Sequence, residues 1–133
     1  MSQASAARPI VVVTHKVPGE VVVPGAEVRQ SPAEKRSRDE VLRAIAGASF
    51  IITMYFDKVD AEFLDAAGPQ LKGVCNFAVG YDNIDVKLCK SRGVKVANTP
   101  GAVTEGTADL AWTLILACAR RLIPADRFAR TDE

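Results

Sequence analysis

The segment 71–119 constrains the fold most strongly, because it alternates short β-like runs with glycine-marked turns and then enters a long apolar helix pattern. Residues 74–76 and 94–97 have strand character, and residues 85–92 between them have the length and closing glycine of a helix. A strand, a helix and a second strand in this order are typical of a parallel βαβ unit. The loops after both strands then open at one edge of the sheet, where open α/β sheets bind ligands.

Three further strands are predicted before this segment. Residues 10–14 and 50–53 are apolar runs typical of buried strands, and residues 27–30 fit a second short strand after the break at Pro24. The tally is about five strands alternating with helices of roughly 8 to 12 residues. We therefore expect an α/β fold with a parallel sheet that has helices on both faces.

Two short helices have recognisable first residues. Ser37 and Glu40 have the spacing of a capping box, so a helix is expected to follow Ser37 and to end at Gly47. Asp60 is expected to cap a second helix, which ends where Gly68 precedes a proline. Both helices have an apolar stripe that predicts packing against the sheet.

A longer helix is expected after Thr104, with Glu105 in its first turn and Arg120 and Arg121 at its carboxyl end. It is apolar on every side, which is typical of a helix inside a protein or between two domains. The apolar run is far shorter than the roughly 20 residues that a membrane span needs.

The composition of 133 residues, with 48% hydrophobic and 25% charged, suits one ordinary globular domain. The net charge of +1 gives no general attraction to nucleic acid or to an anionic membrane. Residues 1–9 lack the apolar stretch of a signal peptide. Cys75, Cys89 and Cys118 have no metal-ligand spacing, so we expect no metal site and buried, reduced thiols in a cytoplasmic protein.

Two loops are the candidate sites. In the first, the turn at Val79 and Gly80 can expose consecutive N–H groups that suit a carboxylate or phosphate, although a plain βα turn has the same spacing. In the second, residues 99–107 place hydroxyls and free N–H groups at a helix start, which suits an anionic cofactor group or a simple cap. Tyr55 and Phe56 follow the third strand and could wall the crevice or form the edge of the core.

Other chemistry has weaker support. His15 is the only histidine, has no Ser, Cys or carboxylate constellation near it in the sequence, and is expected to have a surface or turn role. The chain also has no G-x-G pair, so the dinucleotide fingerprint is absent from it.

Residues 79–85, 92–100 and 104–109, followed by an apolar helix that ends in Ala119, Arg120 and Arg121, resemble the D-isomer-specific 2-hydroxyacid dehydrogenases. The resemblance is strong from residue 71 to 121 and weaker over the rest. Within that family the sequence is most similar to the glyoxylate/hydroxypyruvate reductases.

The resemblance implies a flavodoxin-like substrate domain over residues 1–101 and a linking helix over 102–133 that leads to a Rossmann-type cofactor domain. Family members reduce a 2-keto acid to a D-2-hydroxy acid by hydride transfer from NADH or NADPH, and we expect homodimers. By resemblance, the N–H groups of Val79 and Gly80 hold the substrate carboxylate. Tyr55 and Phe56 belong to the loop that covers the substrate, and Thr107 lies near the cofactor.

By resemblance, the family's glycine-rich cofactor loop and its catalytic Arg, Glu and His are expected beyond residue 133. His15 does not match the catalytic position. A keto-acid reduction needs a proton donor and a cation near the substrate oxygen. We therefore expect a truncated member that is inactive alone and does not bind NAD(P) tightly.

Two alternatives compete with this interpretation. One is a stand-alone flavodoxin-like module that docks a partner through the apolar residues 112–116, since large apolar patches rarely stay bare. The other is a flavodoxin or receiver domain, which is disfavoured because residues 14–19 offer neither a hydroxyl-rich phosphate loop nor an acidic pair.

Overall fold

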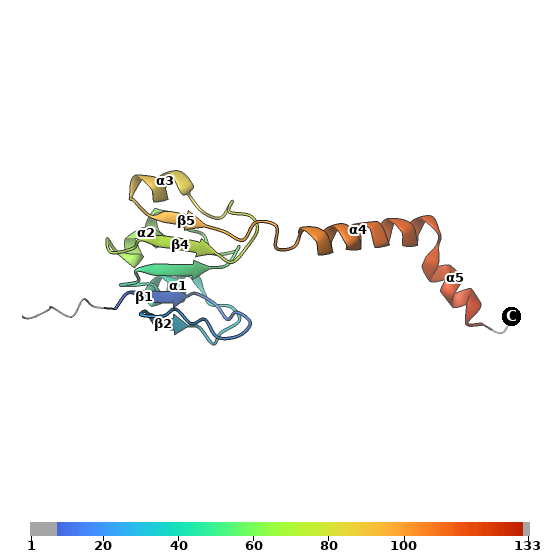
Figure 1. The fold of residues 1–133 in the computed structure, drawn as a ribbon, viewed down its shortest axis with the longest axis horizontal. Helices are drawn as coiled ribbons and strands as arrows, with labels where there is room; N and C mark the ends of the chain where they lie inside the picture. The colour runs from blue at the N-terminus through green and yellow to red at the C-terminus, as the bar shows by residue number, and fades with distance from the viewer. Residues whose placement is uncertain (1–7, 132–133) are drawn as a thin grey trace, which may run out of the picture. The chain divides into compact units, whose positions relative to one another are not determined.

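A computed structural model describes residues 8–131 of the chain. The chain divides into two compact units, the first ending at Pro100 and the second beginning at Gly101. The first unit contains a five-stranded sheet in the order β2-β1-β3-β4-β5 (Figure 1). All neighbouring strands are parallel. This order is the flavodoxin-like one, and it confirms the predicted α/β class with a parallel sheet of five strands.

The strands lie close to where the sequence predicted them: β1 Ile10–Val13, β2 Glu27–Gln30, β3 Phe50–Thr53, β4 Gly73–Asn76 and β5 Lys95–Ala97. The helices between them are α1 Arg38–Ala44, α2 Ala61–Ala67 and α3 Val86–Ser91. The predicted caps are confirmed, because the full capping box is present at Ser37 and Glu40 and the Asp60 side chain accepts from the Phe63 N–H.

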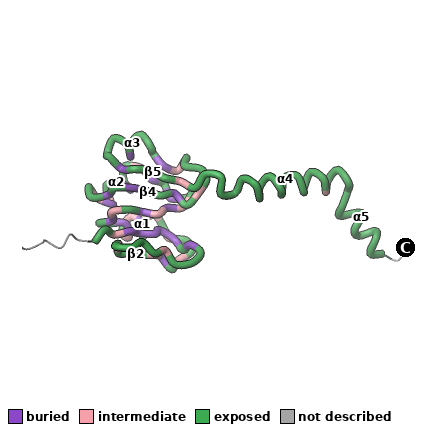
Figure 2. Tube along the Cα trace, viewed as in Figure 1, coloured by how far each residue is buried: buried purple, intermediate pink, exposed green. Residues whose placement is uncertain are grey.

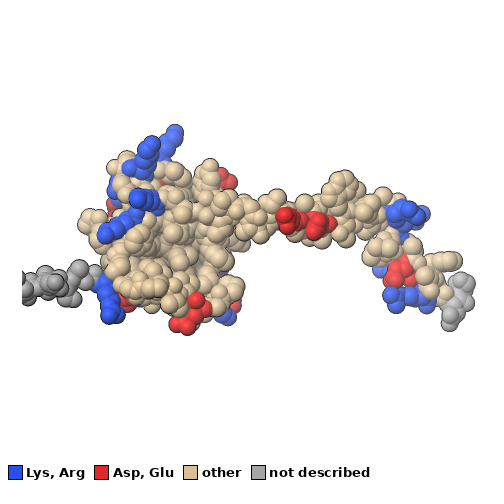
Figure 3. Space-filling view, in the orientation of Figure 1, with Lys and Arg blue, Asp and Glu red and all other residues tan. Residues whose placement is uncertain are grey.

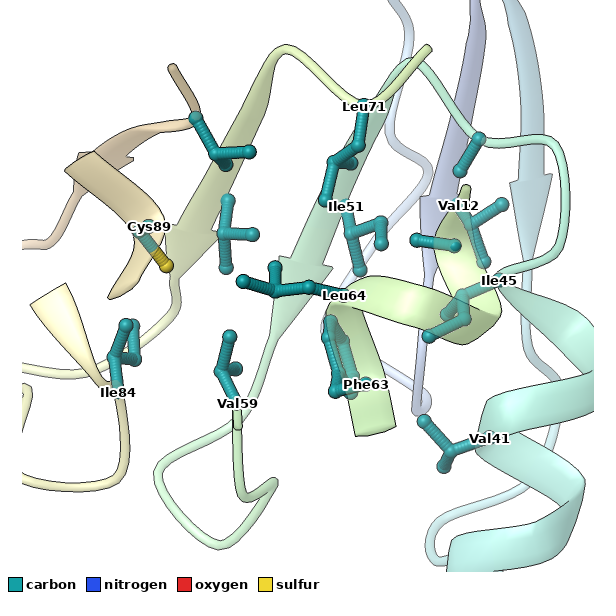
Figure 4. Close-up of a cluster of buried hydrophobic side chains, with 14 residues drawn as sticks. Val12, Val41, Ile45, Ile51, Val59, Phe63, Leu64, Leu71, Ile84 and Cys89 are labelled. Carbon is teal, nitrogen blue, oxygen red and sulfur yellow. The ribbon is translucent and has the colours of Figure 1, made fainter. Parts of the chain in front are cut away.

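One face of the sheet carries the core. The side chains of Val12, Ile51 and Val74 are adjacent in register on β1, β3 and β4. They belong to a buried cluster that also contains residues from α1, α2 and α3, among them Phe63 and Ile45 (Figure 4). The three helices of this unit therefore pack on a single face.

The opposite face of the sheet differs from the prediction of helices on both faces. Right-handed crossovers place α1, α2 and α3 on one side of this strand order, and only the β1–β2 connection crosses the other side. That connection contains no helix. Along the row Val13, Ile52, Cys75 and Ala97, Val13 is buried whereas Cys75 and Ala97 are exposed. The exposed end of the row lies on β4 and β5.

The cysteine prediction holds for one residue of three. Cys89 is buried in the core cluster, whereas Cys75 and Cys118 are exposed. Cys75 is exposed because it lies on the sheet face that no helix of its unit covers. The expectation that all three thiols are buried was therefore wrong.

The second unit consists of α4 Thr104–Ala119 and α5 Leu122–Ala129. Neither helix has a buried residue, and both are exposed along their length (Figure 2). The sequence pattern did not predict α5. The chain leaves α4 at Arg120 and begins α5 at Arg121, which adopts the left-handed conformation with φ 49°. Among the helices within residues 8–131, none is long and apolar enough to cross a membrane.

The caps of α1 and α2 should make stability depend on acid pH. The Ser37 hydroxyl and N–H lower the pKa of Glu40. Burial alone would raise the pKa of Asp60, but the Phe63 N–H and the Arg38 guanidinium lower it overall. A carboxyl with a lowered folded-state pKa stabilises the fold above its unfolded pKa, and this contribution is lost as the pH falls through the folded pKa.

We therefore expect the urea midpoint to fall as the pH drops from about 5 to about 3, where unfolded carboxyls take up protons. Asp60→Asn should fall less steeply over this range, because the variant has one depressed carboxyl fewer. If the urea midpoint changed equally steeply with pH in the wild type and in Asp60→Asn, this explanation would be contradicted.

Candidate functional site

The carboxyl ends of the central strands are polar and buried. Thr14 follows β1, while Thr53 and Asn76 end β3 and β4, and all three are almost completely buried. The Thr53 hydroxyl donates to Asn76 Oδ1 at 3.0 Å. The Thr14 hydroxyl donates to Asp57 Oδ2 at 2.7 Å. The apolar core therefore gives way to a hydrogen-bonded network at the edge where the sequence predicts a ligand.

The turn at Val79 and Gly80 follows β4 at this edge, and both of its carbonyls accept hydrogen bonds. Asn98 Nδ2 donates to the Val79 carbonyl at 2.7 Å, and Asn76 Nδ2 donates to the Gly80 carbonyl at 2.8 Å. Among residues 8–131, no acceptor receives the N–H of Val79 or of Gly80. Two neighbouring peptide N–H groups are thus available to an external acceptor, and such donors suit an anion.

Neither the backbone conformation nor the space around residue 80 requires a glycine in the chain without a ligand. It is absent from the glycines with positive φ, and a Cβ at this position would meet nothing within 4 Å. The space over its backbone is open, so an acid can approach the N–H groups closely.

The segment after β5 lies beside this turn. The Thr99 N–H donates to the Ala78 carbonyl at 3.0 Å, next to the bond from Asn98 to Val79. The structure therefore brings together the two loops that the βαβ pattern placed at one edge. Their role in binding an acid remains a prediction.

The loop Met54–Phe56 lies on the other side of the turn, because Asn83 Nδ2 donates to the Met54 carbonyl at 3.2 Å. Tyr55 is 70% exposed and Phe56 is 42% exposed. Their rings meet edge to face with centroids 4.9 Å apart. The Phe56 ring also meets the buried His15 ring edge to face, with centroids 4.8 Å apart. A role of Tyr55 and Phe56 as a wall over the turn remains a prediction.

His15 contradicts its prediction, because it is 1% exposed. Its Nε2 lies 2.8 Å from Asp57 Oδ1, and its Nδ1 accepts the Arg36 N–H at 3.1 Å. An accepting Nδ1 carries no proton, so Nε2 bears the hydrogen and donates it to the carboxylate. Both nitrogens are committed, so this imidazole has no free nitrogen for acid–base chemistry. Its partner Asp57 lies 42 residues away in sequence, so no local pattern pointed to it.

Thr107 belongs to the second unit. It lies in the first turn of α4 and is exposed, and no side chain caps this helix. The N–H groups in the first turn of a helix have no partner within the helix, so an uncapped start can accept an anionic group. The N–H of Thr107 itself donates to the Val103 carbonyl at 3.0 Å. The cofactor contact that the resemblance implies for Thr107 remains a prediction.

Two hollows in the surface of the first unit lie elsewhere. Cavities of about 450 and 520 Å³ are lined mainly by α2 and α3 and the segments that follow them, and neither reaches the Val79–Gly80 turn. In the view of Figure 3 the surface of this unit is mostly uncharged, with basic side chains gathered near α3. The candidate site therefore lies at an open edge, and the donors it offers to an anion are the local N–H groups of Val79 and Gly80.

Fold and edge together define a parallel α/β domain with two neighbouring peptide N–H groups, those of Val79 and Gly80, that have no acceptor among residues 8–131. Residues 11–132 match the profile of the family described as D-isomer specific 2-hydroxyacid dehydrogenase, catalytic domain. The chain belongs to this family.

Individual relatives agree with this assignment. The glyoxylate reductase of Thermococcus kodakarensis is 45% identical over 130 residues, which are 95% of this chain and 39% of that protein. The crystal structure of the TT0316 protein from Thermus thermophilus is similar with a TM-score of 0.73 and 35% identity, over 91% of this chain and 40% of that one.

A third relative carries ligands. It is the NADPH-dependent glyoxylate/hydroxypyruvate reductase of Sinorhizobium meliloti in complex with NADP and malonate, with a TM-score of 0.60 and 30% identity over 93% of this chain and 38% of that one. The chain thus spans about two fifths of the length of these relatives.

Proposed function

We propose that this chain is the substrate-holding part of an NAD(P)-dependent 2-hydroxyacid dehydrogenase that reduces glyoxylate or a similar small 2-keto acid. The observation that carries the proposal is the Val79–Gly80 turn, whose carbonyls are bonded while its N–H groups have no acceptor among residues 8–131. The names of two relatives, both glyoxylate reductases, support glyoxylate as the substrate.

In this proposal the substrate carboxylate accepts hydrogen bonds from the N–H groups of Val79 and Gly80. Neutral donors orient the acid without adding a fixed positive charge. Tyr55 and Phe56 exclude water from the bound acid. The 2-keto carbon takes up a hydride and its oxygen a proton, which yields the 2-hydroxy acid. The nicotinamide cofactor, when bound, supplies the hydride.

The same proposal assigns the first turn of α4, including Thr107, to the cofactor. Its support is the start of this helix, which has no side-chain cap, so that the N–H groups of Glu105 and Gly106 and the exposed hydroxyl of Thr107 suit an anionic group. By the resemblance, the proton donor and the cation that polarises the keto oxygen are residues with no match in this sequence. The single histidine is bonded to Asp57 and to the backbone N–H of Arg36.

The 133-residue chain is therefore expected to show no oxidation of NADH or NADPH with glyoxylate above a blank. The measurement is nicotinamide absorbance, with the glyoxylate reductase of Thermococcus kodakarensis as the positive control. Reduction of glyoxylate by the chain alone would refute the proposal that this chain holds the substrate but lacks the proton donor and the cation.

The binding half of the proposal is tested by NMR titration of the same chain with oxalate, a small acid that cannot be reduced. The amide signals of Val79 and Gly80 should shift, while sodium chloride of equal ionic strength should leave them unchanged. No response at either amide would refute the site.

A second candidate function is a module that binds a protein partner through α4, which would include the homodimer contact expected from the resemblance. The observation in its favour is that Trp112 on this helix is 64% exposed. Such a module needs no acid, so the oxalate titration distinguishes the two candidates.

Free thiols at Cys75 and Cys118 are consistent with a reducing compartment such as the cytoplasm.

A further inference from the structure

Two asparagine side chains connect the loop Met54–Phe56 with the Val79–Gly80 turn. Asn83 Nδ2 donates to the Asp57 carbonyl at 2.8 Å and to the Met54 carbonyl at 3.2 Å, at the two ends of the first loop. Asn76 Nδ2 donates to the Gly80 carbonyl at 2.8 Å. Each asparagine therefore holds one of the loops.

The two amides also bond to each other. Asn76 Nδ2 donates to Asn83 Oδ1 at 3.0 Å, and Asn83 Nδ2 lies 3.3 Å from Asn76 Oδ1. The orientation of the Asn83 amide is determined by its surroundings, because a flipped amide would point its oxygen at the Met54 and Asp57 carbonyls. The pair therefore forms a continuous link between the loops.

The first loop is also fixed from β1. Asp57 Oδ2 accepts the Met54 N–H at 2.9 Å and the Thr14 hydroxyl at 2.7 Å. Asp57 Oδ1 accepts from His15. Within the part of the chain that the structure describes, no buried side-chain polar atom lacks a partner. Such a satisfied network has one favoured arrangement, and loss of one member leaves buried groups unpaired.

We propose that Asn83, together with Asn76, is a positioning residue that holds the aromatic loop and the acid-binding turn as one unit. The proposal rests on the proposed function, because it gives the link a reason: one small acid must meet both loops at a fixed spacing. A displacement of about 1 Å at a reacting centre can reduce a rate on the order of a hundredfold.

The test compares wild type with Asn83→Leu in the 133-residue chain by amide hydrogen exchange. The Met54 N–H reports on the first loop, and the Thr99 N–H, which donates to Ala78, reports on the turn. Both should exchange at least about tenfold faster in the variant, because the donors to the two loops are coupled. The amides of β1 should be unchanged.

The matched control is Ile45→Val, which removes a buried methyl group just after α1, in a core cluster that contains no residue of either loop. It should not accelerate Met54 and Thr99 selectively. Asn83→Asp keeps the side-chain size and replaces the two donated bonds with oxygen–oxygen contacts, so it provides the same test if Asn83→Leu does not fold.

The inference would be overturned if the Met54 or Thr99 amide exchanged in Asn83→Leu as slowly as in the wild type. It would also be overturned if Ile45→Val accelerated the exchange of these amides equally. A wild-type chain that does not respond to oxalate would instead refute the proposed function. Faster exchange at both loops would still support the link in that case, so the two failures are distinguishable.

Discussion

Replacing Gly80 with alanine is expected to weaken oxalate binding on the order of tenfold and to leave the free energy of unfolding unchanged or slightly higher. The added methyl group enters the open space above the turn, where the acid would approach, and overpacking of this kind costs roughly 1–3 kcal/mol. It meets no atom of the chain within 4 Å and no positive φ, so the fold is not strained. Alanine also restricts the unfolded chain, which stabilises by about 0.4–1 kcal/mol.

The control for Gly80→Ala is Gly93→Ala. Gly93 has φ +72° after α3, and a Cβ there also meets nothing within 4 Å. The only cost of an alanine at this position is the left-handed backbone conformation, which lowers the stability by roughly 1–2 kcal/mol. The substitution should leave oxalate binding unchanged. NMR titration gives the affinities and urea unfolding gives the stabilities. Equal affinity of wild type and Gly80→Ala would argue against an acid over this turn.

Phe63→Ala is expected to lower the free energy of unfolding by about 3–5 kcal/mol, because a large buried side chain is lost and a cavity remains. Phe63 is completely buried in α2, within the cluster that joins the helices to the sheet (Figure 4). Since domains of this size are stable by only about 5–15 kcal/mol, the variant should be close to unfolding.

Phe128→Ala is the matched control, because the same side chain in α5 is 71% exposed. Its effect should stay within roughly 0.5 kcal/mol. Urea unfolding followed by far-ultraviolet circular dichroism measures both variants. A loss below about 1 kcal/mol for Phe63→Ala would show that the core does not depend on α2 as described.

The features that sequence predicted well depend on neighbours in the chain. The capping box of Ser37 and Glu40 is a contact between residues three apart, and it forms as expected. The cap by Asp60 and the glycine turn at Gly68, with φ 95°, are equally local. Strand positions followed from apolar runs for the same reason. The second helix of the carboxyl-terminal unit was not predicted, because its break depends on the left-handed backbone of one residue, Arg121.

The candidate site was predictable only in part. The Val79–Gly80 turn could be named from its spacing and from the family resemblance, and its role in binding an acid remains a prediction. The residues that hold it in place were not found, because Asn76 and Asn83 look like ordinary turn residues in the sequence. Cys75 was misjudged as buried, because its apolar neighbours do not reveal which sheet face the helices cover.

The alternation of strands and helices, the helix caps and the glycine turns could all be derived from the order of amino acids, since each depends on interactions between residues a few positions apart. The placement of α1, α2 and α3 on one face, and the burial of His15 against a carboxylate 42 residues away, became known only from the folded chain. Burial and hydrogen-bond partners at the edge of a parallel sheet come from different strands, which the chain connects only through long crossovers.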